Sequence, residues 1–403
     1  TTVSGSGASA DLSFAGSYGG LRDDLLAWDH GNGDALGFAA SAADGVQPKQ
    51  GSGFNVEGME FGRGGSATAY LGFRAPQVPP GARHDALVVP VTNLLDLLSG
   101  GATHATFGAP LEWDLGGLGV REIRRSGADR YLVIAGAADE GGAQRLYTWD
   151  GDPAHQPVPA GGDLPSGGLD GAWEAIVRVP DALGDGSAVQ LVEDNGDSVW
   201  YGGSTVGKDL AAGLEKDWTD TASLRLPGQA VAFGPTPPSP AYAGTTYAPS
   251  ASGGASGQPV AFSIDPSSGA GVCSAAGGVV SLLRAGRCVI AADQAGTFQY
   301  AAAARVTQTV QVTQIASAAL CTLTDKDVQG SAAYRRLGPI ARIVVDALVT
   351  SECRLLTGLA PKLPAAQKQA LIAAYGQGVA SLASGGWLTA AQAAGLRALA
   401  ATL

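Results

Sequence analysis

Short runs of alternating apolar and polar residues fill residues 1–230, and clusters of Gly, Pro, Asp and Asn separate them. Such runs predict β-strands joined by turns. One run with a single charge at the same point occurs three times, as FNVEGMEF (54–61), GVREIRR (119–125) and AWEAIVRV (172–179). The charged residues are Glu57, Arg121 and Glu174. This recurrence predicts three copies of one structural unit.

Two further strand-like runs follow each copy. The second runs are AYLGF, RYLVI and AVQLV, and the third are ALVVPV, QRLYTW and DSVWYG, the last entered through the turn signal Asn195-Gly196. The charged positions are 64 and then 53 residues apart. A repeat of three or four antiparallel strands at this period predicts the blades of a β-propeller. A β-sandwich is the alternative, but it does not explain the period.

Residues 1–53 add at most one more blade, built from ADLSF, LLAWD and ALGFAA. A propeller usually has four to eight blades, so this ring is at the lower limit or open. An open ring exposes strand edges, which pair with other chains unless they are covered. The polar arm of residues 1–10 could also supply a strand to a neighbour. The pattern therefore predicts a homo-oligomer or a filament.

The Pro-rich stretch FGPTPPSPAYAG marks the end of the first domain. Five further strand-like runs predict a small β-sandwich before about residue 312: PVAFSID, GVCS, VVSLL, RCVIAAD and TVQVTQ. We therefore expect a mainly β chain with three domains. These are a β-propeller-like domain (1–230), an Ig-like β-sandwich (231–315) and a small C-terminal α-helical bundle (316–403).

The last domain is rich in Ala and Leu at helical spacing. One helix is predicted over about 332–356, and a second from Pro364 at its first position. Thr389 and Gln392 predict a capping box at the start of a third helix.

The formal net charge of −11 argues against nucleic acid or an anionic membrane as a partner, because both require a basic surface. No apolar stretch reaches the roughly 18 residues that a transmembrane helix needs. The chain opens with Thr1-Thr2 and a Ser/Gly run, which is typical of a mature protein whose signal peptide has been removed, although a trimmed chain would look the same.

The four cysteines form two pairs that lie close in the sequence, Cys273 with Cys288 and Cys321 with Cys353. Neither pair has the spacing of a zinc site, and the four histidines are scattered. Both pairs fit disulfides formed in an oxidising compartment. Four free buried thiols are the alternative.

Five charged residues occupy comparable places in the repeats and form the candidate site: Glu57, Arg74, Arg121, Glu174 and Asp194. First strands line the channel of a propeller, so these side chains could converge at its mouth. The carboxylates of Glu57, Glu174 and Asp194 could bind Ca²⁺, or the arginines could hold a phosphate or carboxylate group. The alternative is structural, because buried carboxylates and guanidinium groups need each other as partners.

Residues 50–225 resemble an uncharacterised family of secreted bacterial propellers that is related to domains labelled "esterase-like activity of phytase". The resemblance rests on FNVEGMEF, AYLGFRAP, WDLGGLGVREI, LVIAGA, RLYTWDG and EDNGDSVWY. It implies a fold but no mechanism, because the family has no settled activity. Residues 229–313 resemble a bacterial Ig-like repeat, on the segments TPPSPAYAGTTY, VAFSID, GVCS, AGRCVIAADQAG and FQYAAA. That resemblance implies a spacer with an internal disulfide.

The tail resembles a helical module of the FIMAH type, found at the C-termini of secreted bacterial proteins. This order of modules implies a secreted, extracellular or cell-surface protein with a partner in that location. Two functions remain open. One is binding, adhesion or self-assembly without catalysis, and the other is metal-dependent hydrolysis of phosphoesters or esters at the channel mouth. The chain has no G-x-S-x-G motif, which weakens a serine esterase.

Overall fold

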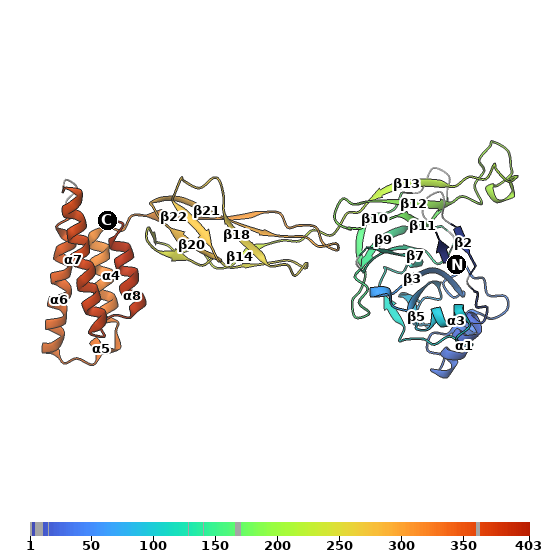
Figure 1. The fold of residues 1–403 in the computed structure, drawn as a ribbon, viewed down its shortest axis with the longest axis horizontal. Helices are drawn as coiled ribbons and strands as arrows, with labels where there is room; N and C mark the ends of the chain where they lie inside the picture. The colour runs from blue at the N-terminus through green and yellow to red at the C-terminus, as the bar shows by residue number, and fades with distance from the viewer. Residues whose placement is uncertain are drawn as a thin grey trace. The chain divides into compact units, whose positions relative to one another are not determined.

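The computed structural model describes residues 2–4, 11–14, 16–127, 129–139, 141–165, 171–359 and 363–403. It confirms a mainly β protein, with 30% strand and 24% helix. The chain divides into two compact units (Figure 1). The first comprises residues 1–228 with 296–302, and the second comprises residues 229–295 with 303–403.

Three antiparallel sheets make up most of the first unit, and in each of them strands that are neighbours in space are also neighbours in sequence. The first sheet contains β3 (Asn55–Phe61), β4 (Ala69–Ala75), β5 (Ala86–Val91) and β6 (Leu111–Trp113). The second contains β7 (Gly119–Ser126), β8 (Arg130–Gly136), β9 (Gln144–Trp149) and β10 (Val158–Asp163). The third contains β11 (Ala172–Arg178), β12 (Ala188–Asp194) and β13 (Trp218–Ser223). The three charged runs of the sequence thus form the first strand of each sheet.

The sheets pack face to face in chain order. Leu71 and Phe73 of β4 pack against Leu25 and Phe38, which belong to helices α1 (Leu21–Gly31) and α2 (Phe38–Ser41). The other face of the first sheet packs against the second sheet through a cluster that includes Tyr70, Val88, Val120 and Trp149. The second sheet then packs against the third through Leu132, Ile134, Trp173, Ile176 and Leu191. The helices therefore cover the outer face of the first sheet.

The third sheet differs from the prediction in its last strand. Residues 197–202 were expected to be a strand, but only an isolated bridge between Val199 and Val206 forms there. After the turn at Asn195-Gly196 the chain folds into a loop, which is closed by hydrogen bonds from Gly207 N to Ser198 O and from Lys208 N to Gly196 O, both 2.8 Å. The third strand is β13 instead, which is largely exposed.

Residues 1–53 were expected to add at most one blade, and in their described part LLAWD and most of ALGFAA lie in or beside helices rather than strands. The run LLAWD lies in α1, where Leu21, Leu25 and Trp28 are spaced as on one face of a helix. Asp23 and Asp24 in the first turn favour the helix through its dipole. The strands β1 (Thr2–Ser4) and β2 (Asp11–Ser13) pair with each other. Residue 1 and most of the N-terminal arm (5–10) lie outside the described residues.

The second unit begins with short strands that form two main sheets. The strands are β14 (Ala232–Phe233), β15 (Ala241–Tyr242), β16 (Thr246–Tyr247), β17 (Ala251–Ser252), β18 (Val260–Ile264), β19 (Cys273–Ala276), β20 (Val279–Leu282), β21 (Gly286–Gln294) and β22 (Val306–Thr313). Their orders are β15-β22-β21-β18 and β16-β20-β19, and β14 pairs with β17. The five strand-like runs of this region are confirmed as β18 to β22.

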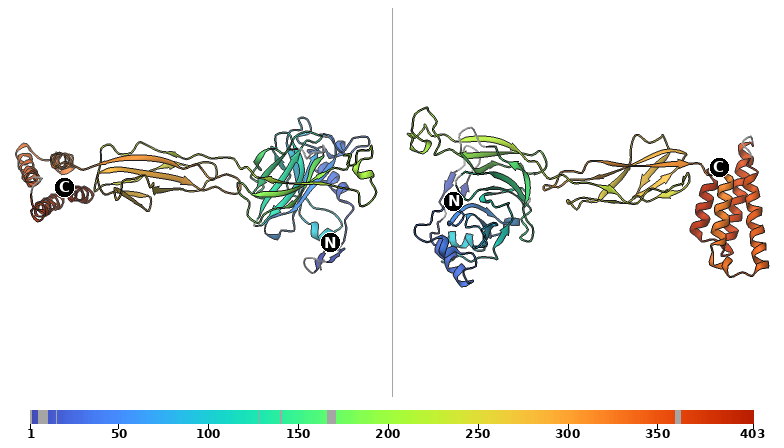
Figure 2. Two further views of the ribbon diagram at one scale, coloured as in Figure 1. Left: turned by 90° about the horizontal axis from the view of Figure 1, so that it is seen from above. Right: turned by 180° about the vertical axis from the view of Figure 1, so that it is seen from behind.

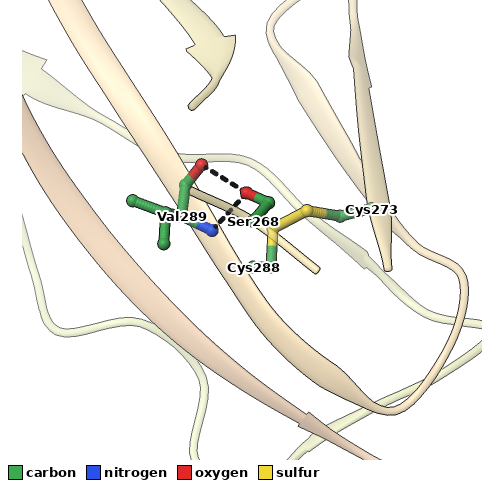
Figure 3. Close-up of a disulfide and its surroundings, with 4 residues drawn as sticks. All are labelled: Ser268, Cys273, Cys288 and Val289. Carbon is green, nitrogen blue, oxygen red and sulfur yellow. Dashed lines mark hydrogen bonds between the residues drawn. A yellow bond between two sulfur atoms is a disulfide. The ribbon is translucent and has the colours of Figure 1, made fainter. Parts of the chain in front are cut away.

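Cys273 of β19 and Cys288 of β21 form a disulfide that links the two sheets (Figure 3). Beside it, the Ser268 hydroxyl donates to the Val289 carbonyl (3.2 Å) and accepts from the Val289 N–H (2.9 Å). The turn before β19 is thereby held against β21. This pair was predicted correctly.

The C-terminal helices run side by side in Figure 2 and are α4 (Ser317–Gln329), α5 (Ala332–Arg335), α6 (Pro339–Thr357), α7 (Ala365–Ser384) and α8 (Ala390–Ala400). Buried Leu320, Val349, Tyr375, Val379 and Leu396 contribute to their core. The predicted capping box of Thr389 and Gln392 is confirmed. The predicted helix over 332–356 is interrupted before Pro339, and the described bundle has four long helices where three were expected. None of the described helices is long and apolar enough to cross a membrane.

The predicted disulfide between Cys321 and Cys353 is wrong, because both residues are free thiols. Cys321 on α4 directs its sulfur at the backbone carbonyl of Cys353 on α6, at 3.6 Å. The thiol of Cys321 is therefore engaged as a hydrogen-bond donor. Burial, together with the hydrogen bond that the Cys353 thiol makes to Cys321, raises the pKa of Cys353.

Candidate functional site

The charged residue of each repeat lies at a β-bulge. On β3, Val56 pairs with Phe73 and Gly58 with Gly72, which leaves Glu57 without an opposite residue. On β7 the register shifts in the same way around Arg121, and on β11 around Glu174. A bulge inserts one residue into a strand and redirects its side chain. The three charged side chains therefore leave their sheets at equivalent points.

Four of the five predicted site residues meet in a chain of ion pairs. Arg74 Nη1 lies 3.1 Å from Glu57 Oε1, and Arg121 Nη1 lies 3.1 Å from Glu57 Oε2. The same Nη1 atom of Arg121 lies 2.7 Å from Glu174 Oε1. Both arginine side chains are only 3% exposed. Each carboxylate and guanidinium group of the chain thus has a partner of opposite charge, as buried charges require.

Backbone carbonyls hold the two guanidinium groups in place. Arg74 donates through Nε to Ala138 O (2.8 Å) and through Nη2 to Asp139 O (2.9 Å). Arg121 donates through Nη2 to Ala137 O (3.3 Å). All three nitrogens of Arg74 are therefore already engaged, and the predicted clamp for a phosphate or carboxylate ligand would have to displace existing bonds.

Glycines allow the sheets to approach closely enough for these contacts. A side chain at Gly119 would collide with the backbone carbonyl of Arg74, with its Cβ only 2.1 Å from the oxygen. A Cβ at Gly136 would lie 3.0 Å from Arg121 Nε. That Nε is buried and has no hydrogen-bond partner. The glycines thus bring the second sheet against Arg74 and leave room for Arg121.

Glu174 is the most exposed member of the ion-pair chain, at 30%. Its pKa is raised because burial disfavours the charged form, although the Arg121 guanidinium counteracts this and the Glu57 carboxylate reinforces it. Arg74, Arg121 and Glu174 line a cavity of about 210 Å³. The cavity is also lined by Lys49, Gln144, Asp194, Asp197 and Ser198, with backbone from nearby glycines.

Asp194, the fifth predicted residue, lines the cavity but is not a member of the ion-pair chain. Its Oδ1 accepts a hydrogen bond from Gly196 N at 2.8 Å, which stabilises the turn after β12. The proposed calcium ligands Glu57, Glu174 and Asp194 are not gathered into a metal site, since the described residues contain no group of three or more His, Cys, Asp or Glu that could hold a metal ion. Arg121 lies between the two glutamates and takes up the negative charge that a cation would need.

The sequence missed Gln144 and Lys49. Gln144 at the start of β9 donates through Nε2 to Trp173 O (2.8 Å) and accepts through Oε1 from Trp173 N (2.7 Å). It thereby joins the second and third sheets beside the cavity. Gln144 lies outside the repeated charged run, so the sequence pattern did not indicate it as a site residue. Lys49 lies in the segment that was predicted to be part of a blade.

Comparison with known proteins adds no family to this geometry. No protein-family model matches the chain, and no curated protein matches it. The function must therefore be inferred from the chain's own residues.

Proposed function

We propose that the chain is a secreted or cell-surface protein that acts in binding, adhesion or self-assembly, without catalysis. The ion-pair chain carries the proposal. The repeated charged residues are the candidates for chemistry, and Arg74, Glu57, Arg121 and Glu174 are already bonded to each other. Removing one member of a buried network of this kind leaves an uncompensated charge, so a reaction at Glu57 or Arg121 would disrupt the contact between repeats.

The first unit is best interpreted as a β-propeller-like domain. Equivalent positions on β3, β7 and β11 meet through their side chains, as expected where first strands gather near one axis. For the sheets of β14 to β22, an Ig-like spacer is supported by the disulfide and the antiparallel strand order. The disulfide also supports an oxidising, extracellular location. The helices form the third module, for which the FIMAH-type resemblance remains a proposal.

Self-assembly is the form of binding that we favour. The third sheet ends in the exposed strand β13, which pairs only with β12 among the described strands. An exposed edge of this kind can pair with another chain.

One observation favours hydrolysis as a second candidate. Glu174, with its raised pKa, lines the 210 Å³ cavity together with Lys49 and Arg121. A carboxyl group with a raised pKa can act as a general acid.

Two measurements test the proposal on the full chain. Sedimentation velocity over a wide concentration range should show association, and a single species of 40.2 kDa at every concentration would contradict self-assembly. Assays with phytate, a phosphodiester and an acyl ester, with and without added divalent metals, should show no turnover. Turnover that Glu174→Gln abolishes would establish the hydrolase instead.

A further inference from the structure

Helix α6 exposes an apolar face that nothing in the described bundle covers. Its members are Ile340, Ile343, Val344, Ala347 and Leu348, here called the α6 outer face. Ile340 is 80% exposed and Ile343 is 68% exposed. The opposite side of the same helix carries the buried residues Val345, Val349 and Leu356. Helix α6 is therefore apolar on both sides. Packing in the bundle core explains the apolar residues of its inner face but not those of its outer face.

The charges on α6 are sorted by sign. The Tyr334 hydroxyl donates one bifurcated hydrogen bond to the two carboxylate oxygens of Asp346, at 2.9 and 3.0 Å. The Glu352 carboxylate lies against Gly378 of α7, where a side chain at residue 378 would collide with it. Arg342 and Arg354 of α6 are exposed, and so is Arg336, which lies before the helix at the end of α5. The α6 outer face is therefore apolar with cationic ends and carries no carboxylate.

The C-terminal helical region is basic overall, whereas the first unit is acidic. Residues 316–403 contain eight Lys and Arg against four Asp and Glu. Residues 1–228 contain 14 Lys and Arg against 30 Asp and Glu, a formal net charge of −16. A basic apolar surface and an acidic body thus occur on one chain, and two copies can satisfy each other electrostatically.

The acidic body offers a matching surface in the loop of residues 197–218, here called the acidic aromatic loop. Tyr201 and Leu214 are 50% and 49% exposed, and the Tyr201 hydroxyl donates to Leu214 O at 3.1 Å. Lys216 lies 4.6 Å from the centre of the Tyr201 ring. These contacts order the loop. The loop has four acidic residues against two lysines, and one of these, Lys208, pairs with Asp197, so Asp209, Glu215 and Asp217 are the carboxylates left outside that ion pair.

We propose that the α6 outer face of one copy docks on the acidic aromatic loop of a second copy. Isoleucine and leucine side chains would pack against Tyr201 and Leu214, and the arginines would lie against the carboxylates at the rim. Charge complementarity favours this loop over a second α6 face, because the arginines at the ends of α6 would find carboxylates on the loop and none on another α6 outer face. The contact joins different surfaces, so it propagates as a ring or filament. The inference rests on the proposed self-assembly and assigns it a contact in addition to the exposed edge of β13.

The test is a charge exchange in the full chain, followed by sedimentation velocity across concentration and salt. The first variant carries Arg336→Glu and Arg354→Glu, the second carries Glu215→Arg and Asp217→Arg, and the third combines all four. Each pair alone should weaken association at least about tenfold, and the combination should recover most of it. Lys326→Glu with Arg397→Glu, which changes the bundle's charge equally on α4 and α8, should leave association unchanged. A neutral variant, Ile340→Ser with Ile343→Ser, should also weaken association while the melting temperature stays within a few degrees.

The outcomes separate the inference from the proposed function. Association of the parent protein that all variants retain would overturn the docking surfaces and leave self-assembly intact. A parent protein that is monomeric at every concentration would overturn both. Vesicles with anionic lipids provide the remaining arm. One outcome is that the parent protein binds these vesicles, with binding abolished by the α6 substitutions and unaffected by charge reversal at Glu215 and Asp217. In that case the α6 outer face docks on a membrane and the inference is wrong.

Discussion

The first unit and the helical bundle depart in opposite ways from the usual distribution of residues, with charges outside and apolar side chains inside. In the first unit, Arg74 and Arg121 are buried with Glu57. On α6, Ile340 and Ile343 are exposed. The buried charges find their partners on neighbouring repeats of the same chain. The exposed apolar residues have no such partner in the described bundle. Buried charges that are paired within the chain contribute to its folding. Exposed apolar residues without a partner in the bundle are available for association with another molecule.

The largest expected effect comes from breaking the buried network at Glu57. Glu57→Gln removes the carboxylate that Arg74 and Arg121 share, and Arg74, which pairs with Glu57 in the ion-pair chain, then stays buried without that counter-charge. We expect the free energy of unfolding to fall by about 3 kcal/mol or more. Urea denaturation of the parent protein and of Glu57→Gln measures this change in the free energy of unfolding.

Glu174→Gln is the matched control for Glu57→Gln. Arg121 keeps its contact with Glu57 there, and Glu174 is more exposed, so the loss should be about 1 kcal/mol. Equal losses in the two variants would show that Glu57 is not the central member of the network.

A pair of substitutions on α6 compares the two faces of one helix. Val349→Ala opens a cavity in the bundle core and should reduce the free energy of unfolding by about 2 kcal/mol. Val344→Ala removes the same atoms from the exposed face and should change it by less than about 0.5 kcal/mol. Thermal and urea unfolding of both variants measure the difference. A large loss for Val344→Ala would mean that the outer face is already covered within one chain.

The smallest effect concerns Glu122, the residue that follows the bulge on β7. Burial raises the pKa of its carboxyl from 4.5 to about 7, with Arg124 lowering it and Glu60 raising it. The folded protein therefore binds a proton more tightly than the unfolded chain, and stability from this group is present below about pH 4.5 and is lost as the pH rises to about 7. Glu122→Gln should remove this loss, which we expect to be about 1 kcal/mol after solvent screening. Unfolding curves of the parent protein and of Glu122→Gln at pH 4.5 and 7.5 measure this effect. If the Glu122 carboxyl titrates normally, the two proteins will show the same pH dependence of stability.

The sequence predicted the first three strands of each of the first two sheets and the residues that meet at their first strands, but not the fourth strands β6 and β10. The period was informative because alternation and turn residues are local properties. It did not show that Glu57, Arg121 and Glu174 are bulge residues, because a bulge depends on the partner strand. The structural alternative for these residues, arginine paired with glutamate, is the arrangement that the structure has.

Three errors have physical causes in particular residues. LLAWD was interpreted as a strand although its leucines and Trp28 also fit helical spacing, and packing of Leu25 against the first sheet decides for the helix. Residues 197–202 have strand composition, but the turn at Asn195-Gly196 leads into a loop closed by Lys208. Cys321 and Cys353 are neighbours in space, as their helices suggested, but the direction of the Cys321 sulfur depends on how α4 and α6 pack.

The sequence by itself determined the mainly β composition, the threefold repeat, the link between Cys273 and Cys288, and the helical tail. These features follow from local periodicity and from the spacing of residues in the chain. Only the tertiary structure decided the ion-pair chain, the cavity beside Glu174 and the second, exposed face of α6. Each of these depends on which elements pack together, and the free energy of a buried charge or an exposed isoleucine is set by the neighbours that packing supplies.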